Sequence, residues 1–358
     1  MAKQWLTRYL LYALVLSLSF GQLMRLEVYG LQLFVHDILV VLLIPLLLID
    51  YKERILVIPR GLKLLLLGLL LGWIRALTLY PAVQLLIPFM YTLRLLAYLT
   101  LYHFIPNTKY QIPNTIFFLS GLVTLAIGLL QYFLLPDMLV FQFLGWDDHL
   151  NRLTLPHYDP TYTGVMLVMY LILLSPYNIQ NILYSIPYAA GILLTYSRSV
   201  WLSLIITVSM FIKKKIYLLG IFPILLVAIL LVPKKFGEGN NLLRTYSITS
   251  RLESDLSYFR NLGWDLITGR GMNTLVLETP VSRYPNHATG PNNSYLYLLA
   301  TTGIIGLVGW GIFLKSLYID SKHHALITFV VIASLFNNVM FYPFSLLLML
   351  LTNLKPKD

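Results

Sequence analysis

Cysteine is absent from this 358-residue sequence, and charged residues make up only 11% of it. The lack of cysteine excludes thiol catalysis and a disulfide-stapled secreted scaffold, and it leaves the redox compartment open. The scarcity of charge excludes a water-soluble domain, because such a domain needs more charged residues to cover its surface. A disordered tail is excluded as well, since 58% of the residues are apolar.

Apolar runs recur along the whole chain, and many are long enough to cross a hydrocarbon core of roughly 30 Å. The first run, Tyr9 to Phe20, is not followed by a small-residue cleavage site, so we expect a retained span and not a signal peptide. The pattern predicts one all-α integral membrane domain, residues 1–358, with about twelve transmembrane helices. The expected spans are 6–23, 31–49, 64–80, 83–104, 113–135, 160–176, 181–196, 199–212, 216–233, 293–314, 324–341 and 343–353.

Basic residues indicate which side of the membrane is cytoplasmic. The formal net charge is +11, from 26 Lys and Arg against 15 Asp and Glu. Placing the N-terminus in the cytoplasm puts fourteen basic residues in inner segments, whereas the short outer loops hold only Arg25 and Arg152. We therefore expect cytoplasmic N- and C-termini and a long outer loop at 234–292. Nucleic acid is not needed to explain the basic excess.

Arginine and lysine are distributed differently between the two sides. Eleven of the 13 Lys lie in inner segments, whereas ten of the 13 Arg lie outside or within spans. Orientation alone does not separate the two residues, because both mark the inner side. A planar guanidinium binds phosphate or carboxylate through two hydrogen bonds and stays charged when buried. The distribution favours an anion-binding site on the outer face over simple anchoring of each arginine at lipid headgroups.

A charge inside a span is costly unless it is paired. Arg75 and Asp37 lie at similar depths in neighbouring spans, and we expect them to form an ion pair. Arg94 lies near the middle of its span with no second acid in any span. Its expected partner is an amide, such as Gln84, Gln131 or Asn338, or the phosphate of a bound lipid.

Two outer segments carry polar residues suited to a substrate. The stretch from Thr195 to Leu204 places Arg198 in a tight polar turn, which suits a lipid-linked phosphate or an interfacial anchor. The loop 136–159 is rich in Asp, His and aromatic residues, but their spacing matches no metal cage. We expect a sugar-binding surface there instead, without a metal ion. The residues considered as metal ligands were Asp147, Asp148, His149 and His157.

The loop 234–292 is expected to carry an amphipathic helix along the membrane surface. Ser250 and Glu253 are spaced as a capping box, and apolar residues follow at helical spacing. His287 lies a few residues before the tenth span, beside an arginine-rich face, and is a candidate base. The polar face of the helix is predicted to present Arg251, Asp255, Tyr258 and Asp265.

Several segments carry a family resemblance through their order and spacing. They are GLLQYF (Gly128–Phe133), the stretch from Arg152 through Asp159-Pro160, SRSVWL (Ser197–Leu202), SRL (250–252) with the later Gly269-x-Gly271, and NNSYLYLLATTGIIG (Asn292–Gly306). Together they resemble the O-antigen ligase and Wzy-type O-antigen polymerase family of bacterial membrane glycosyltransferases. The resemblance covers roughly 125–310 by motif and the whole chain by topology.

The resemblance implies roles for individual residues. Arg198 and Arg251 would hold the donor diphosphate, assisted by other arginines. The ligase signature places a catalytic His where this chain has Asn292. Either His287 replaces it, or a carboxylate is the base, or no side-chain base is needed, and the departure favours polymerase over ligase. The other implied diphosphate-binding residues are Arg94, Arg152 and Arg260, and those for acceptor or sugar are Trp146, Asp148, Asp159, Tyr258, Asn292 and Asn293.

The implied reaction transfers a glycan from an undecaprenyl-diphosphate carrier to an acceptor sugar hydroxyl, at the outer face of the bacterial cytoplasmic membrane. Arginines would stabilise the charge that grows on the leaving diphosphate, so no cofactor is expected, and direct displacement would invert the anomeric centre. Two other classes stay open. A polyprenyl-lipid or polysaccharide transporter should show internal repeats and helices broken at mid-membrane. A lipid-binding scaffold would not need arginines, His and acids in one loop.

Overall fold

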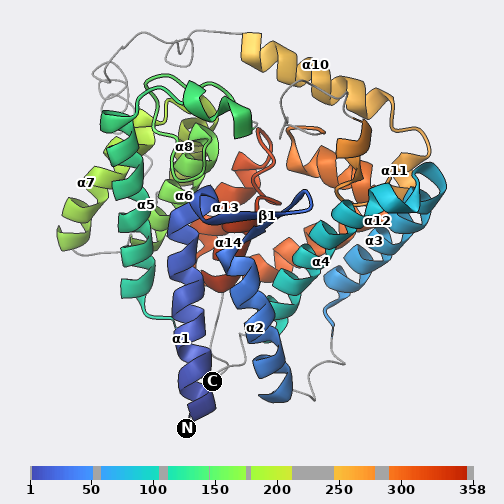
Figure 1. Ribbon diagram of the computed structural model, residues 1–358, viewed down its shortest axis with the longest axis horizontal. Coiled ribbons are helices and arrows are strands. Elements are labelled where there is room, and N and C mark those ends of the chain that lie inside the picture. The colour runs from blue at the N-terminus through green and yellow to red at the C-terminus, as the bar shows by residue number, and fades with distance from the viewer. Residues whose placement is uncertain are drawn as a thin grey trace.

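The computed structural model describes residues 2–50, 58–104, 112–144, 146–174, 179–211, 246–278 and 290–352, which are mostly α-helical (Figure 1). The α-helices are α1 (Ala2–Ser17), α2 (Val35–Asp50), α3 (Arg60–Leu79), α4 (Ala82–Phe104), α5 (Asn114–Leu134), α6 (Pro160–Leu174), α7 (Ile179–Leu194), α8 (Arg198–Phe211), α10 (Tyr246–Arg260), α11 (Asp265–Thr268), α12 (Ser294–Asp320), α13 (His324–Ala333) and α14 (Pro343–Thr352). The remaining elements are the 3-10 helices η1 (Leu18–Met24), η4 (Leu139–Leu144) and η6 (Thr274–Glu278) and the strands β1 (Arg25–Val28) and β2 (Leu31–Phe34).

Five helical segments of the described residues are long and apolar enough to cross a membrane: Gln4–Met24, Arg60–Leu79, Ala82–Phe104, Asn114–Leu134 and Ser294–Asp320. Each coincides with a predicted span. Shorter apolar helices of 10–17 residues occupy the positions of further predicted spans: Val35–Ile49, Pro160–Leu174, Ser185–Leu194, Arg198–Phe211, His324–Ala333 and Pro343–Thr352. The predicted ninth span, 216–233, lies outside the described residues. Helix length and composition are those of a helical membrane protein.

A β-hairpin connects the first two apolar helices. The second span was predicted to begin at residue 31, but Leu31–Phe34 pairs antiparallel with Arg25–Val28, and α2 begins only at Val35. Tyr29 and Gly30 both have positive φ values, of 51° and 80°, which a two-residue hairpin turn requires. The prediction was wrong for these four residues because a short apolar run does not distinguish a strand from a helical turn.

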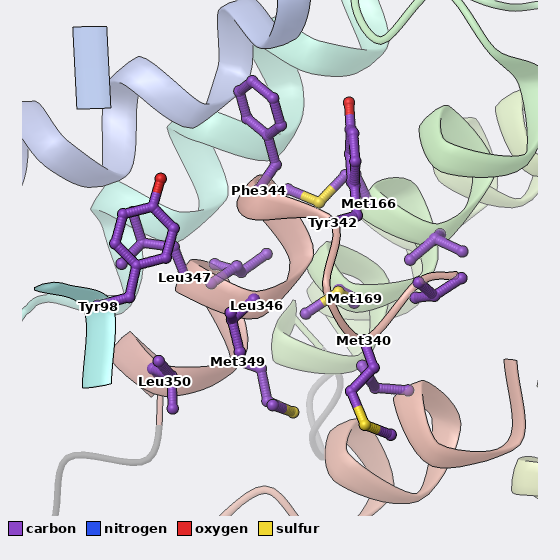
Figure 2. Close-up of a cluster of buried hydrophobic side chains, with 14 of the residues drawn as sticks. Tyr98, Met166, Met169, Met340, Tyr342, Phe344, Leu346, Leu347, Met349 and Leu350 are labelled. Carbon is purple, nitrogen blue, oxygen red and sulfur yellow. The ribbon is translucent and has the colours of Figure 1, made fainter. Parts of the chain in front are cut away.

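The core surrounds α14. All of its residues from Phe344 to Thr352 are buried, so this short helix is enclosed by protein. Met166 and Met169 of α6 and Tyr98 of α4 belong to the same buried cluster (Figure 2).

Helix α10 crosses the end of the molecule opposite the N-terminus (Figure 1).

Glycines allow α3 and α12 to pack closely. A Cβ atom built on Gly68 of α3 would lie 2.5 Å from Gly306 of α12, and one built on Gly61 would lie 2.5 Å from Phe313. Side chains larger than a hydrogen atom would force the two backbones apart. This close packing gives a structural reason for the glycine at 306.

Helix α12 is interrupted at Gly303, whose φ of 65° and ψ of −175° are not helical. Near the interruption, the carbonyl oxygens of Ala300 and Thr301 accept hydrogen bonds from the backbone N–H groups of Arg270 and Gly271, at 2.9 and 3.0 Å. The segment that follows α11 is therefore docked onto α12 through backbone hydrogen bonds. This docking positions the C-terminal end of the α10–α11 segment.

Candidate functional site

A cavity of about 1340 Å³ lies among α10, the N-terminal ends of α8 and α12, and the C-terminal end of α13. The segment 147–161 forms another of its walls. We call it the first cavity. Half of the predicted site residues line it: Arg152, Arg198, Arg251, Asp148, Asp159 and Asn293. The fold therefore brings together arginines from three segments that are far apart in the sequence.

Arg251 is held by hydrogen bonds that link α10 to α8. Its Nη1 donates to Asn337 Oδ1 at 2.9 Å, and Nδ2 of Asn337 donates to Ser199 Oγ at 3.0 Å. Ser199 follows Arg198 at the start of α8, so the amide fixes the two arginine-bearing helices relative to each other. Asn337 is buried, and sequence reasoning missed it. A polar residue inside the predicted apolar span 324–341 was the signal available.

Arg152 lies in a segment that is pinned at several points. Its Nε donates to the carbonyl oxygen of Thr195 at 2.9 Å. Its own carbonyl oxygen accepts from Gln131 Nε2 at 3.1 Å, and Gln131 Oε1 accepts from the backbone N–H of Thr154 at 2.8 Å. Gln131 belongs to the GLLQYF segment, so this motif has a structural role here: it fastens the segment that contains Arg152 and Thr154 to α5.

Asp159 and His149 lie beside each other on the wall of the first cavity. Asp159 Oδ1 caps α6 by accepting from the N–H groups of Thr161 and Tyr162 at 2.6 and 3.0 Å, and its Oδ2 lies 3.8 Å from His149 Nε2. An imidazole near a carboxylate is suited to accept a proton during catalysis. Sequence reasoning considered His149 as a metal ligand or as part of a sugar-binding surface, and not as a base. Among the described residues, no group of three or more His, Cys, Asp and Glu is arranged to hold a metal ion.

Asp255 lies next to the position where the ligase signature has its His. Asp255 Oδ1 accepts from the backbone N–H of Asn292 at 3.0 Å, while the side chain of Asn293 caps α12 by accepting from Tyr295 N at 2.9 Å. Burial raises the pKa of the Asp255 carboxyl, and the backbone hydrogen bonds and the charge of Arg251 oppose this rise. A carboxylate of raised pKa in a cavity is a candidate proton acceptor.

The expected pairing of the charges within spans was wrong. Arg94 Nη2 lies 2.9 Å from Asp37 Oδ2 and also donates to the carbonyl oxygen of Gln32, whereas Arg75 Nε lies 3.7 Å from Asp265 Oδ1. Arg94 thus has a carboxylate and a backbone carbonyl as partners, not the expected amide or lipid phosphate. The reason is tertiary: the β-hairpin returns to α4, so the start of α2 lies beside Arg94. Arg94 lines a different cavity of about 560 Å³, which we call the second cavity.

The other predicted site residues are not part of the lining of the first cavity, or they lie outside the described residues. Trp146 stacks on Tyr158, with ring centroids 5.3 Å apart, and lines the second cavity. Tyr258 lines a smaller cavity of about 260 Å³, and Arg260 is exposed at the end of α10. Asn292 contributes its backbone to Asp255. His287 lies outside the described residues.

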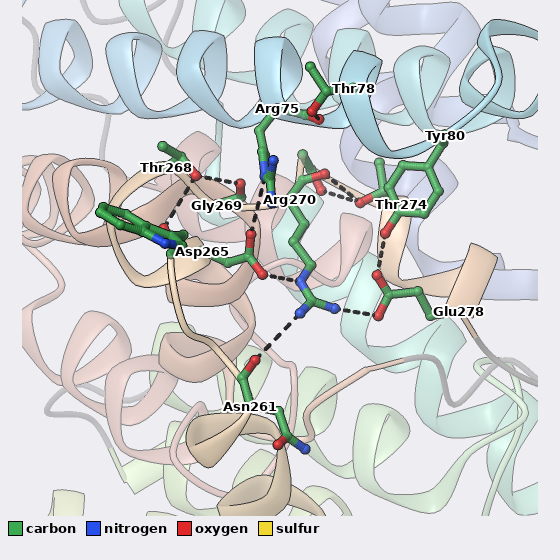
Figure 3. Close-up of polar contacts among 12 residues, drawn as sticks. Arg75, Thr78, Tyr80, Asn261, Asp265, Thr268, Gly269, Arg270, Thr274 and Glu278 are labelled. Carbon is green, nitrogen blue, oxygen red and sulfur yellow. Dashed lines mark hydrogen bonds and ion pairs between the residues drawn. The ribbon is translucent and has the colours of Figure 1, made fainter.

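An ion-pair network fastens the α11 segment to α3 (Figure 3). Arg270 donates to Asp265 and to Glu278, the latter at 2.7 Å, and Tyr80 also donates to Glu278. Asp265 is only 5% exposed. It therefore faces protein, and its predicted place on the exposed polar face of the amphipathic helix was wrong.

Helix α10 starts earlier and ends sooner than the sequence predicted. It already runs at Tyr246, so Ser250 lies inside the helix and the capping-box prediction was wrong. The chain turns after Arg260, with Gly263 at a φ of 49°, before the short α11 begins. The apolar face of α10 is largely uncovered: Leu252, Leu256 and Phe259 are 59%, 44% and 57% exposed. An uncovered apolar face suits a helix at a membrane surface.

The polar groups that line the first cavity are of two chemical kinds, and apolar side chains such as Leu252, Leu256 and Phe259 complete its lining. Its arginines can hold a phosphate or diphosphate through forked hydrogen bonds, and its carboxylates and His149 can accept protons or bind sugar hydroxyls. A scan against protein-family models and a search of curated proteins found no match to this chain. What the cavity binds therefore has to be inferred from its own side chains.

Proposed function

We propose that this protein is a membrane glycosyltransferase that transfers a glycan from an undecaprenyl-diphosphate carrier to the hydroxyl group of an acceptor sugar. The supporting observation is that Arg152, Arg198 and Arg251 line one cavity together with carboxylates and His149. Arginine stays charged when partly buried, and several guanidiniums in one cavity suit a ligand that carries more than one negative charge. A diphosphate meets that requirement, and the acids and the imidazole suit a hydroxyl acceptor.

We also propose about twelve spans in the bacterial cytoplasmic membrane, cytoplasmic N- and C-termini and an outer loop at 234–292. Two features support this topology. The described apolar helices occupy the positions of predicted spans. Helix α10 lies at the end of the molecule opposite the N-terminus and lines the first cavity (Figure 1). A cytoplasmic N-terminus therefore puts the cavity at the outer face, where prenyl-linked glycans are assembled in the proposed reaction.

The chemistry follows from the charge that develops during the reaction. The acceptor oxygen attacks the anomeric carbon, the bond from that carbon to the diphosphate oxygen breaks, and the configuration inverts. Negative charge then grows on the departing diphosphate, where fixed arginines stabilise it without reorganising. The acceptor's proton passes to a base. His287 is the candidate from the sequence, and His149 and Asp255 are candidates that line the first cavity.

The acceptor separates two versions of this function. We favour polymerase, because the position of the ligase His is occupied by Asn292, whose backbone N–H bonds Asp255. The alternative is an O-antigen ligase that moves the glycan to lipid A–core. The transporter class is less favoured: α12 is broken at Gly303, but the carbonyl oxygens of Ala300 and Thr301 are bonded to the segment after α11 and do not face a substrate.

The test is transfer by the purified full-length protein in lipid nanodiscs, supplied with a prenyl-diphosphate-linked repeat unit, alone or with lipid A–core. We expect longer prenyl-linked glycans when the repeat unit is given alone. Product on lipid A–core would instead identify a ligase. No product with either acceptor, from protein that still binds pyrophosphate, would contradict the transferase function.

A further inference from the structure

The second cavity is distinct from the arginine-lined first cavity. Its volume is about 560 Å³, and it lies among the β-hairpin, α4, η6 and the N-terminal ends of α12 and α14. Aromatic rings and carboxamides dominate its lining, among them Tyr91, Trp146, Tyr342, Gln22 and Asn338. None of the proposed steps of glycosyl transfer uses this space.

The charge of its lining is balanced. Among the described residues that line the second cavity, Arg94 alone is charged, and Asp37 lies 2.9 Å from it. The guanidinium also lies 4.9 Å from the centre of the Tyr91 ring, and it donates to the carbonyl oxygen of Gln32. Arg94 is thus already engaged by protein groups. Arg94 therefore offers an anionic ligand no unbalanced positive charge.

Two residues that line the second cavity, Gln22 and Asn338, carry buried amide oxygens that are not satisfied by protein. Gln22 Oε1 and Asn338 Oδ1 have no hydrogen-bond partner among the described residues. Gln22 is only 8% exposed; its backbone N–H is bonded to Pro156 O at 2.9 Å, and its side chain forms a hydrogen bond with Tyr342. Amide oxygens can only accept hydrogen bonds. Each oxygen has almost no accessible surface, so a donor from a ligand or from water reaches it only when the amide turns toward the cavity, and an alkyl chain cannot satisfy it.

The two cavities lie on either side of shared walls. Thr161 lines the first cavity and its neighbour Tyr162 lines the second. Likewise, Leu296 lines the first cavity and Tyr297 lines the second. Tyr162 stacks on Tyr342 with ring centroids 4.1 Å apart, which makes this wall rigid. A polymeric substrate whose reacting end lies in the first cavity therefore has a second binding space immediately beside it.

We propose that the second cavity is a subsite for neutral sugar residues, bound by aromatic side chains and by the amide oxygens of Gln22 and Asn338. Sugars offer hydroxyl donors together with apolar ring faces, which match this lining. The identification of these sugars with the acceptor glycan rests on the proposed function. The binding of neutral sugar by the second cavity does not rest on the proposed function, and it is tested by a binding measurement that needs no glycan transfer.

The experiment measures saturation-transfer NMR signals from maltose, lactose and chitobiose, each added to the full-length protein in lipid nanodiscs. We expect a signal from at least one disaccharide, and we expect it to persist when pyrophosphate is added to occupy the first cavity. Asn338→Leu and Gln22→Met keep the side-chain size but remove the acceptor oxygen. Each should weaken disaccharide binding about five- to tenfold, as expected for one lost hydrogen bond.

Matched variants separate the two cavities. Asn114→Leu removes an exposed amide at the start of α5 and should leave disaccharide binding unchanged. Arg198→Ala should weaken pyrophosphate binding and spare the disaccharide. Absence of signal from all three disaccharides, or equal signals from wild type and both cavity variants with unchanged melting temperatures, would overturn the subsite. Disaccharide binding without any glycan transfer would contradict the proposed function and leave the subsite standing.

Discussion

Replacing Asn337 by leucine should selectively weaken the binding of the diphosphate donor. Asn337 Oδ1 accepts from Arg251 at 2.9 Å and its Nδ2 donates to Ser199 at 3.0 Å, so the substitution removes both bonds at similar side-chain volume. A hydrogen bond to a charged group contributes roughly 1.5–3 kcal/mol. Because Arg251 itself is exposed, the lower value applies, and about 1.5 kcal/mol corresponds to about a tenfold change in affinity.

The assay is steady-state transfer with varied donor, together with pyrophosphate binding. We expect the KM for the donor to rise about tenfold while the KM for the acceptor stays constant. Asn338→Leu is the adjacent control, since its amide lines the second cavity and should change the acceptor KM instead.

A double-mutant cycle gives the sharper test of positioning. If Asn337 acts through Arg251, then Arg251→Ala should cost much less in the Asn337→Leu background than in the wild type. Additive losses, or an unchanged donor KM in the single variant, would refute the role that the geometry assigns to Asn337.

Four further predictions concern the arginines, the base, the fold and the metal requirement. Arg198→Lys keeps the positive charge but loses the planar guanidinium that makes two parallel hydrogen bonds, and should lower the transfer rate about 100-fold at normal expression. Near-wild-type amounts of product would show that Arg198 does not bind the diphosphate. Because burial raises the pKa of Asp255 above 3.8, protonation at acid pH should reduce the rate below that raised pKa if Asp255 is the base. In Asp255→Asn the fall of the transfer rate at acid pH should then disappear. If this fall disappears only in His287→Ala, the base is His287. Gly303→Ala puts a Cβ 2.1 Å from Ile267 O at a φ of 65°, and should lower the melting temperature by a few degrees, while Gly311→Ala, with open space around it, should not. EDTA should leave the transfer rate unchanged, and inhibition reversed by Mg²⁺ would contradict an arginine-only site.

The helices were predictable because hydropathy is a local property. The apolar runs at 60–79, 82–104 and 114–134 are long enough to read directly, and the helices found there match the predicted spans closely. Prediction failed where the local signal was ambiguous. Residues 31–34 (Leu-Gln-Leu-Phe) are mostly apolar and fit either a strand or a helix. Ser250 and Glu253 have capping-box spacing but lie inside a helix that begins earlier.

The pairing of charges was beyond the reach of the sequence. Similar membrane depth suggested Arg75 with Asp37, yet a hairpin between the first two helices brings Asp37 to Arg94, and the segment after α10 brings Asp265 to Arg75. Depth in the membrane is only one of the three spatial coordinates that must agree before two side chains can form an ion pair. The same limit applies to Trp146, whose partner Tyr158 could not be chosen from a loop rich in aromatic residues.

The sequence by itself determined the apolar helices, and it supplied the different distributions of arginine and lysine that suggested an anion site. Both depend on composition and spacing along the chain. Only the tertiary structure decided that Arg152, Arg198 and Arg251 share a cavity while Arg94 lies in another, and that Asn337 holds Arg251. These outcomes depend on contacts between residues as many as 138 positions apart, which are set by helix packing and not by any local pattern.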